Sequence, residues 1–241
     1  MPLTFDLPAF AYAHRGLWSA DLPENSLEAF KRASEHGFGA ECDVHLSADG
    51  VPMVFHDFTL ERMTDTQGAI TDASADELHA LHLAGTGHTI PTLSDVLSAM
   101  GDQPLLVELK ADETTDLPGL AAATLMSVAE AQGPVAIMSF SPSLIRICKQ
   151  ITSHITLGLL ADPRRIETPE GRVGFFGIVK DIQPDYLGPN VSQLTHFRDS
   201  NLPLASWTVR DETSLEGCRS LNAAPIFENL PTDLVRAHFA S

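Results

Sequence analysis

Short apolar runs alternate with segments of helical periodicity along the chain. The runs are rich in Val, Ile, Leu and Phe, and about ten residues with apolar positions three and four apart follow each of them. The runs are "AFAYAH", "GAECDV", "PLLVELK", "VAIMSF", "ITLGLL", "DYLGP", "PLASWTV" and "APIFEN". Eight strand-helix units within 241 residues predict an α/β protein with one domain over residues 1–241, folded as a (β/α)8 TIM barrel.

A ninth extended run, "VPMVF", breaks this alternation. Only "ADG" separates it from the strand before it, and so short a connection permits only an antiparallel hairpin. We expect the second strand to pass the barrel rim, turn at Asp49-Gly50 and return His56 beside Glu41 and Asp43. Residues from about 58 to 90 fit no barrel strand, and "TDASADELHALHL" within them has a helical pattern. The hairpin should therefore lead into a small insertion that covers one side of the barrel mouth.

Composition limits the partners. A net charge of −17 disfavours nucleic acid and anionic membranes, so an anionic substrate needs a local cationic site. No apolar run approaches the roughly 18 residues of a membrane span. The first ten residues, "MPLTFDLPAF", lack the basic and apolar regions of a secretory signal. We expect a cytoplasmic protein without a nucleic-acid partner or stable membrane association, and the sequence indicates no oligomeric state.

The three cysteines show no CxxC spacing. Cys42, Cys148 and Cys218 are also odd in number, which argues against a disulfide framework and a zinc ribbon. We expect all three to be buried small residues.

Carboxylates gather at the ends of two predicted strands. Glu41 and Asp43 are two residues apart and share one face of a strand, as do Glu108 and Lys110 on the next barrel strand. Ion pairing at a strand end is one explanation for the first pair. Three carboxylates at the C-terminal rim of a barrel would repel one another unless a cation lay between them. Such oxygen ligands suit one Mg²⁺ or Ca²⁺ ion, with Mn²⁺ as a further candidate, better than zinc.

Basic residues stand next to these carboxylates. His14 and His56 each end an extended run at the expected mouth, where two histidines can supply one acid and one base near neutral pH. Arg15 and Lys110 are candidate phosphate partners, and the alternative is that they pair with the neighbouring carboxylates.

Four further residues allow a structural or a functional interpretation. Asn25 with Glu28 resembles a capping box at the start of a helix from about Asn25, whereas Glu24 precedes that cap and should face the mouth. Trp207 fills the core or forms a pocket wall, and its place at a strand end favours the wall. Asp57 either orients His56 or begins the insertion.

Several motifs together resemble the glycerophosphodiester phosphodiesterase family. They are "HRG" at 14–16, "PENSLEAF" at 23–30, "ECDVHLSADGVPMVFHD" at 41–57, "LERMTDTQG" at 60–68, "VELK" at 107–110 and "WTV" at 207–209. The resemblance is dense over the first 110 residues and thinner, but in order, beyond them. It implies a (β/α)8 barrel with a small insertion that uses a divalent cation to hydrolyse glycerophosphodiesters to sn-glycerol 3-phosphate and an alcohol.

The resemblance also implies residue roles. It assigns metal binding to Glu41, Asp43 and Glu108, acid-base catalysis to His14 and His56, phosphate contacts to Arg15 and Lys110, and the pocket edge to Glu24. In the route it implies, the glycerol 2-hydroxyl attacks phosphorus with one histidine as base, and the other histidine protonates the leaving alcohol. Water then opens the cyclic phosphate.

The chain departs from the family pattern near its C-terminus. "FENLP" places Glu228 and Asn229 where a Thr-Asp-x-Pro pattern is usual, and Arg210 replaces an Asn after "WTV". A carboxylate shifted by one residue along a strand changes face. These departures affect the prediction of which alcohol leaves more than the prediction of the reaction itself.

Two other functions compete with this prediction. Lysophospholipase D-like cleavage predicts an apolar ridge on the insertion, for which "LHALHL" at 78–83 is a faint sign. A non-catalytic module that binds metal and phosphodiester would be favoured by the loss of a catalytic position, and the motifs show none lost.

Overall fold

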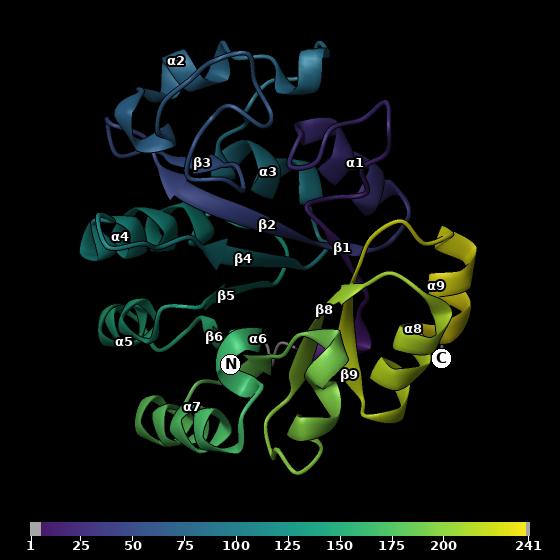
Figure 1. Cartoon of the computed structure of the whole chain (residues 1–241). Coiled ribbons are helices and arrows are strands. Elements are labelled where there is room, and N and C mark those ends of the chain that lie inside the picture. The colour runs from purple at the N-terminus through teal and green to yellow at the C-terminus, as the bar shows by residue number, and fades with distance from the viewer. Residues whose placement is uncertain (1–5, 240–241) are drawn as a thin grey trace.

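Eight parallel strands close into a barrel in the computed structural model, which describes residues 6–239 (Figure 1). The strands are β1 (Tyr12–His14), β2 (Gly39–Leu46), β4 (Leu105–Leu109), β5 (Val135–Ser139), β6 (Thr156–Leu160), β7 (Tyr186–Gly188), β8 (Leu204–Val209) and β9 (Ala223–Phe227). The barrel is closed because β1 pairs with both β2 and β9. The predicted (β/α)8 barrel is confirmed.

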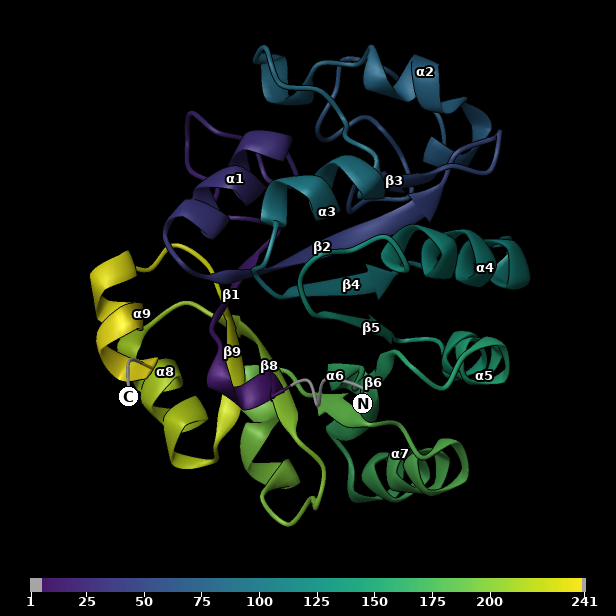
Figure 2. The same ribbon diagram turned by 180° about the vertical axis from the view of Figure 1, so that it is seen from behind.

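Helices cover the outside of the barrel (Figures 1 and 2). They are α1 (Leu27–Glu35), α3 (Leu93–Met100), α4 (Leu117–Val128), α5 (Pro142–Ile151), α6 (Pro163–Ile166), α7 (Pro169–Ile182), α8 (Glu212–Ser220) and α9 (Thr232–Phe239). The unit after β7 differs from the prediction, because the 3-10 helix η4 (Val191–Phe197) stands where an α-helix was expected. Its N-cap, Asn190, accepts a hydrogen bond from the Ser192 backbone N–H.

Alternation along the strands divides the apolar side chains into two cores. One set packs between the strands and the surrounding helices. The other fills the barrel interior, with Tyr12 and Tyr186 as its largest members. At the N-terminal end the 3-10 helix η1 (Leu7–Ala9) packs on β8 and β9, and the Tyr12 hydroxyl donates to the Leu7 carbonyl at 3.2 Å. Because the interior is filled, substrate can enter only from the C-terminal rim.

The predicted hairpin and insertion are both present. Strand β3 (Pro52–Val54) runs antiparallel to β2, and Gly50 takes the positive φ of 81° that the turn requires. The insertion contains η2 (Ile70–Asp72), α2 (Ala75–His79) and η3 (Leu83–Gly85), and it lies beside β3 and α3 in both views (Figures 1 and 2). It has its own small hydrophobic core, which includes Met53 and Phe55 from the hairpin.

Two predicted helices have different limits in the structure. The helical pattern over residues 71–83 yields only α2, because the chain turns after His79 and the Leu83 backbone N–H bonds the His88 carbonyl. Helix α1 starts later than predicted, at Leu27, with Ser26 as its N-cap. Asn25 lies before the helix in the left-handed region, with φ 56°.

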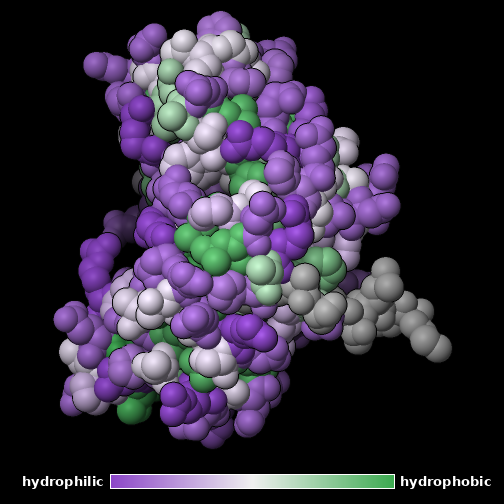
Figure 3. Space-filling view, turned by 90° about the vertical axis from the view of Figure 1, so that its right-hand side faces the viewer, coloured by the Kyte–Doolittle hydropathy of each residue, from purple (hydrophilic) through white to green (hydrophobic). Residues whose placement is uncertain are grey.

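Cys42, Cys148 and Cys218 are free and buried, as predicted. No helix within residues 6–239 is long and apolar enough to cross a bilayer. On the face shown in Figure 3 hydrophilic residues dominate, and hydrophobic ones form small separate patches.

The barrel interior leaves no room for a side chain at Gly158. A Cβ there would overlap the ring of Tyr186, which is 1% exposed. We predict that Gly158→Ala lowers the free energy of unfolding by about 1–3 kcal/mol, the usual cost of overpacking a core. Urea denaturation followed by circular dichroism measures this change.

Gly177 in α7 provides the matched control. A Cβ there meets no atom within 4 Å, so Gly177→Ala should keep or raise stability, by up to about 1 kcal/mol, through its better helix propensity. Equal stability of the two variants would contradict the packing assigned to the barrel interior.

Candidate active site

The predicted site residues meet at the C-terminal rim. The barrel register pairs His14 with Glu41 and Asp43 with Glu108, so neighbouring strands present these side chains side by side. A cavity of about 250 Å³ is lined by eight of the nine predicted residues: His14, Arg15, Glu41, Asp43, His56, Glu108, Lys110 and Trp207. The ninth, Glu24, is not among the lining residues and accepts a hydrogen bond from Arg15 Nη1 at 2.7 Å.

Three carboxylates form the buried centre of the cavity. One oxygen each of Glu41, Asp43 and Glu108 lies within 4.8 Å of the others, and none of these residues is more than 8% exposed. Burial and the charges of its two neighbours raise the pKa of Glu41 well above its usual value. Burial also raises the pKa of Glu108, despite the opposing effect of Lys110. For Asp43 the nearby cations outweigh burial and lower the pKa.

Lys110 and Arg15 offset part of this charge. Lys110 Nζ lies 2.9 Å from Glu108 Oε1 and 3.2 Å from Asp43 Oδ1. Arg15 Nε lies 3.4 Å from Asp43 Oδ2, and the Arg15 backbone N–H donates to Glu41 at 3.1 Å. The pairing with carboxylates that the sequence left open is therefore present. Burial remains the largest cause of the raised pKa values of Glu41 and Glu108, and the cations oppose it.

The donor set fits a divalent cation. It offers carboxylate oxygens in a buried pocket, which is the chemistry that Mg²⁺, Ca²⁺ and Mn²⁺ prefer. The amide oxygen Oδ1 of Asn25 is buried without a hydrogen-bond partner, although its Nδ2 donates to Asp43 at 3.0 Å. An unpaired buried oxygen beside the carboxylates adds to this fit.

Asn25 contacts the carboxylate cluster, which favours the functional interpretation of the two that the sequence left open. Its side chain makes no capping bond to α1, so the predicted capping box is wrong. The signal for the correct interpretation was Ser26, an equally good N-cap one residue later, which releases Asn25 to face Asp43.

His14 is held by a residue from the other end of the chain. Its Nδ1 and Glu228 Oε2 are 2.5 Å apart, and Arg210 Nε donates to the other oxygen of Glu228 at 2.7 Å. Despite burial, the His14 contact and Arg210 lower the pKa of Glu228 to about 2, so the carboxylate is ionised near neutral pH. Nδ1 of His14 therefore carries a proton, and Nε2 is directed to the Glu41 side, 3.9 Å from Oε2. Arg210 and Glu228 stand out in the sequence as departures from the family pattern, but no local pattern predicts the contact with His14, because 214 residues separate its partners.

His56 has a similar partner. Its Nδ1 lies 2.5 Å from Asp57 Oδ1, so Asp57 orients the histidine, which settles the alternative left open by the sequence. Arg62 of the insertion binds Asp57 at 2.5 Å and Glu24 at 2.7 Å. Because Glu24 also binds Arg15, a continuous chain of ion pairs joins the insertion to the barrel rim.

Trp207 forms a wall of the cavity, as predicted. Its indole N–H donates to the Gly188 carbonyl at 2.9 Å, which fixes the ring. Phe140 packs edge-on against it, with centroids 5.4 Å apart. With Met138, Leu160 and Ile226 these rings make one half of the cavity apolar.

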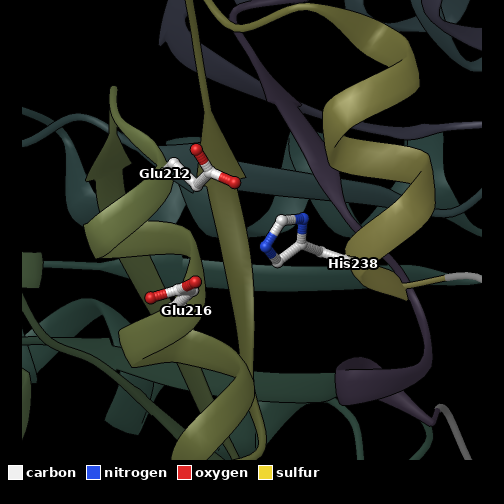
Figure 4. A group of neighbouring side chains, drawn as sticks. All are labelled: Glu212, Glu216 and His238. Atoms are coloured by element: carbon white, nitrogen blue, oxygen red, sulfur yellow. The ribbon is translucent and has the colours of Figure 1, made fainter.

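A second group of possible ligands lies between α8 and α9 (Figure 4). Glu212 and Glu216 are one helical turn apart on α8, and His238 projects toward them from α9. Both glutamates are exposed, so water screens their charges without a metal. Burial therefore distinguishes Glu41, Asp43 and Glu108 as the stronger candidate metal centre.

Comparison with known proteins agrees with this site. The model of the "Glycerophosphoryl diester phosphodiesterase family" matches residues 14–232. A glycerophosphodiester phosphodiesterase from Caldanaerobacter subterraneus subsp. tengcongensis is 36% identical over 234 residues, which cover 92% of this chain and 95% of the relative. A glycerophosphodiester phosphodiesterase from Bacillus altitudinis is 26% identical over 239 residues, with 93% and 96% covered.

Solved structures share the fold. A phosphodiesterase from Oleispira antarctica, solved in complex with the product sn-glycerol-3-phosphate, has a TM-score of 0.80 and 24% identity, with 96% of this chain and 97% of that chain covered. A glycerophosphodiester phosphodiesterase from Thermotoga maritima has a TM-score of 0.73 and 26% identity, with 96% and 98% covered. The chain therefore belongs to the glycerophosphoryl diester phosphodiesterase family and is an enzyme of this class.

Proposed function

We propose that this enzyme hydrolyses small glycerophosphodiesters to sn-glycerol 3-phosphate and an alcohol, with one divalent cation and two histidines. The observation that carries the proposal is the convergence of three buried carboxylates and two carboxylate-bound histidines in one cavity. The relatives named above support the substrate class.

Glu41, Asp43 and Glu108 would hold the cation, which we expect to be Mg²⁺, Ca²⁺ or Mn²⁺. A divalent cation at this place supplies Lewis-acid stabilisation of charge on the phosphate oxygens. Arg15 and Lys110 add positive charge beside it, and each lies close enough to the carboxylates to contact a phosphate bound among them.

The two histidines move the protons. One takes the proton of the glycerol 2-hydroxyl as its oxygen attacks phosphorus, and the other gives a proton to the leaving alcohol as its bond to phosphorus breaks. Water then opens the cyclic phosphate. Because Glu228 and Asp57 occupy the two Nδ1 atoms, Nε2 is the proton-transferring atom of each histidine.

The two competing functions receive less support. Leu78 and Leu83 of the "LHALHL" segment are buried in the core of the insertion, so they form no exposed apolar ridge. A binding module without turnover is disfavoured because both histidines and all three acids stand together in the cavity.

The first test uses metal-stripped protein and a panel of glycerophosphodiesters. We expect release of sn-glycerol 3-phosphate only after Mg²⁺, Ca²⁺ or Mn²⁺ is restored. A coupled assay for glycerol 3-phosphate measures this release. No release with any metal, and with lysophospholipids also intact, would favour the binding module.

Glu41→Gln should separate metal binding from folding. Replacing this carboxyl by a neutral amide should raise the melting temperature of the metal-stripped protein, because burial and the two neighbouring acids make the ionised form of Glu41 unfavourable there. The same change should reduce the stabilisation by added metal, which is about 2.7 kcal/mol at 100 times Kd for the unaltered site. Thermal unfolding with and without metal measures both effects. An unchanged response to metal would remove Glu41 from the metal site.

His14→Ala and His56→Ala should each lower kcat by about 10²–10⁴, the usual contribution of acid-base catalysis. Exposed His154 supplies the control, since His154→Ala should leave kcat unchanged. Steady-state kinetics with saturating metal measures the loss. A decrease of less than about fivefold for either variant would contradict its assigned role.

Glu228 should act through His14. We expect Glu228→Gln to lower kcat at least tenfold with a smaller change in KM, because the neutral amide holds the imidazole less firmly and stabilises its charged form less. The double variant His14→Ala/Glu228→Gln should be no slower than His14→Ala alone. Additive losses would show that Glu228 acts independently of His14.

A further inference from the structure

A second, larger cavity adjoins the catalytic one. Its volume is about 790 Å³, compared with about 250 Å³ for the catalytic cavity. Phe140, Leu160 and Trp207 line both cavities, so the two share the apolar half of the active site as a common wall. The volume lies in the range of cavities that bind small organic ligands.

Residues of α5, α6 and α7, the helices that follow β5 and β6, line this cavity. Helix α7 presents Gly171, Gly174, Phe175 and Ile178 to it, a spacing that places them along one helical face. A Cβ at Gly174 would meet no atom within 4 Å. The cavity is therefore wide partly because this face of α7 carries glycine in place of a larger side chain.

The charges and the apolar lining restrict what this cavity can take. Arg164 and Arg165 line it together with Asp162, and the side chain of Arg164 is 95% exposed. For a cationic alcohol such as choline or ethanolamine the lining offers one carboxylate, Asp162, and Arg164 Nε already lies 3.9 Å from it. The remaining lining is mainly apolar and aromatic, which favours a hydrocarbon body.

The two halves of the catalytic cavity determine which part of the substrate lies here. The phosphate and the free hydroxyls of glycerol need polar partners, and these lie on the half formed by Glu41, Asp43, Glu108 and the neighbouring cations. The alcohol is then left with the half formed by Phe140, Leu160 and Trp207, and the same three residues also line the larger cavity.

We propose that the larger cavity binds the leaving alcohol of the substrate, and that this alcohol has an uncharged apolar body of alkyl or aryl type. The inference rests on the proposed function and defines its substrate class. Phe140 and Trp207 line both cavities, and Gly174 leaves open space in the larger one.

The test compares two substrates that differ only in the alcohol: sn-glycero-3-phospho-octanol and sn-glycero-3-phosphoethanolamine. We expect kcat/KM for the octyl ester to be at least about tenfold higher. Burying even one additional methylene group in a fitting apolar pocket typically raises kcat/KM by about this factor. Equal values, or preference for ethanolamine, would overturn the inference.

Gly174→Leu should fill the cavity without disturbing the fold, because open space surrounds this position and Leu favours a helix over Gly. We expect kcat/KM for the octyl ester to fall about tenfold or more and that for the ethanolamine ester to change less than twofold. Gly177→Leu, on the same helix but outside the cavity lining, is the matched control and should change neither value. Equal effects of the two variants would overturn the inference.

A third substrate distinguishes the two ends of the diester. 1-Octanoyl-sn-glycero-3-phosphoethanolamine carries its hydrocarbon on the glycerol side. If only this substrate has a raised kcat/KM, and only its kcat/KM falls with Gly174→Leu, the alcohol does not occupy the cavity and the inference fails. Failure of the proposed function is a separate result, in which no diester of the panel releases sn-glycerol 3-phosphate or its acylated form with any metal.

Discussion

The repulsion among three buried carboxylates is the constraint on which this active site depends. Glu41, Asp43 and Glu108 come within 4.8 Å of one another inside the protein, where water screens little of their charge. Neighbouring cations and hydrogen-bond donors offset part of this negative charge. Lys110 lies between two of them, and Asn25 donates an amide hydrogen to Asp43. The strained left-handed backbone of Arg15, with φ 58°, directs a peptide N–H to Glu41. An ion pair, a hydrogen bond from a side-chain amide and a strained backbone conformation thus all stabilise the same carboxylate cluster.

The two histidines that we propose as proton-transferring residues bind a second set of carboxylates around this centre. Glu228 from the last strand holds His14 of the first, which is possible because barrel closure brings β9 against β1. Asp57 holds His56, and Arg62 ties Asp57 to Glu24 and so to Arg15. The insertion therefore has a defined physical connection to the catalytic rim. Movement of the insertion would break the ion pairs of Arg62 and release the support of His56.

Local and pairwise patterns explain what the sequence predicted well. Alternation two residues apart placed Glu41 with Asp43, and the three-residue "ADG" connection required the hairpin that returns His56. The role of Asn25 stayed open because two adjacent residues were equally suited to cap α1, and only the tertiary contact with Asp43 decides between them. The contact of Glu228 with His14 spans 214 residues and depends on closure of the barrel, which no local pattern encodes. The sequence did not predict the larger cavity, because a single glycine such as Gly174, which leaves space open, forms no recognisable motif.

The two halves of the site are built by different parts of the fold. The polar half comes from strand ends whose register is fixed by the barrel, so its geometry follows from pairing alone. The apolar half comes from the ends of β5, β6 and β8 and opens toward α6 and α7, whose positions depend on side-chain packing outside the barrel. A substitution in α7 can therefore change the space next to Trp207 without moving a carboxylate. With the roles that we propose, bond cleavage and the choice of alcohol are separable, because the residues for the first are fixed by hydrogen-bonded strands and those for the second by helix packing.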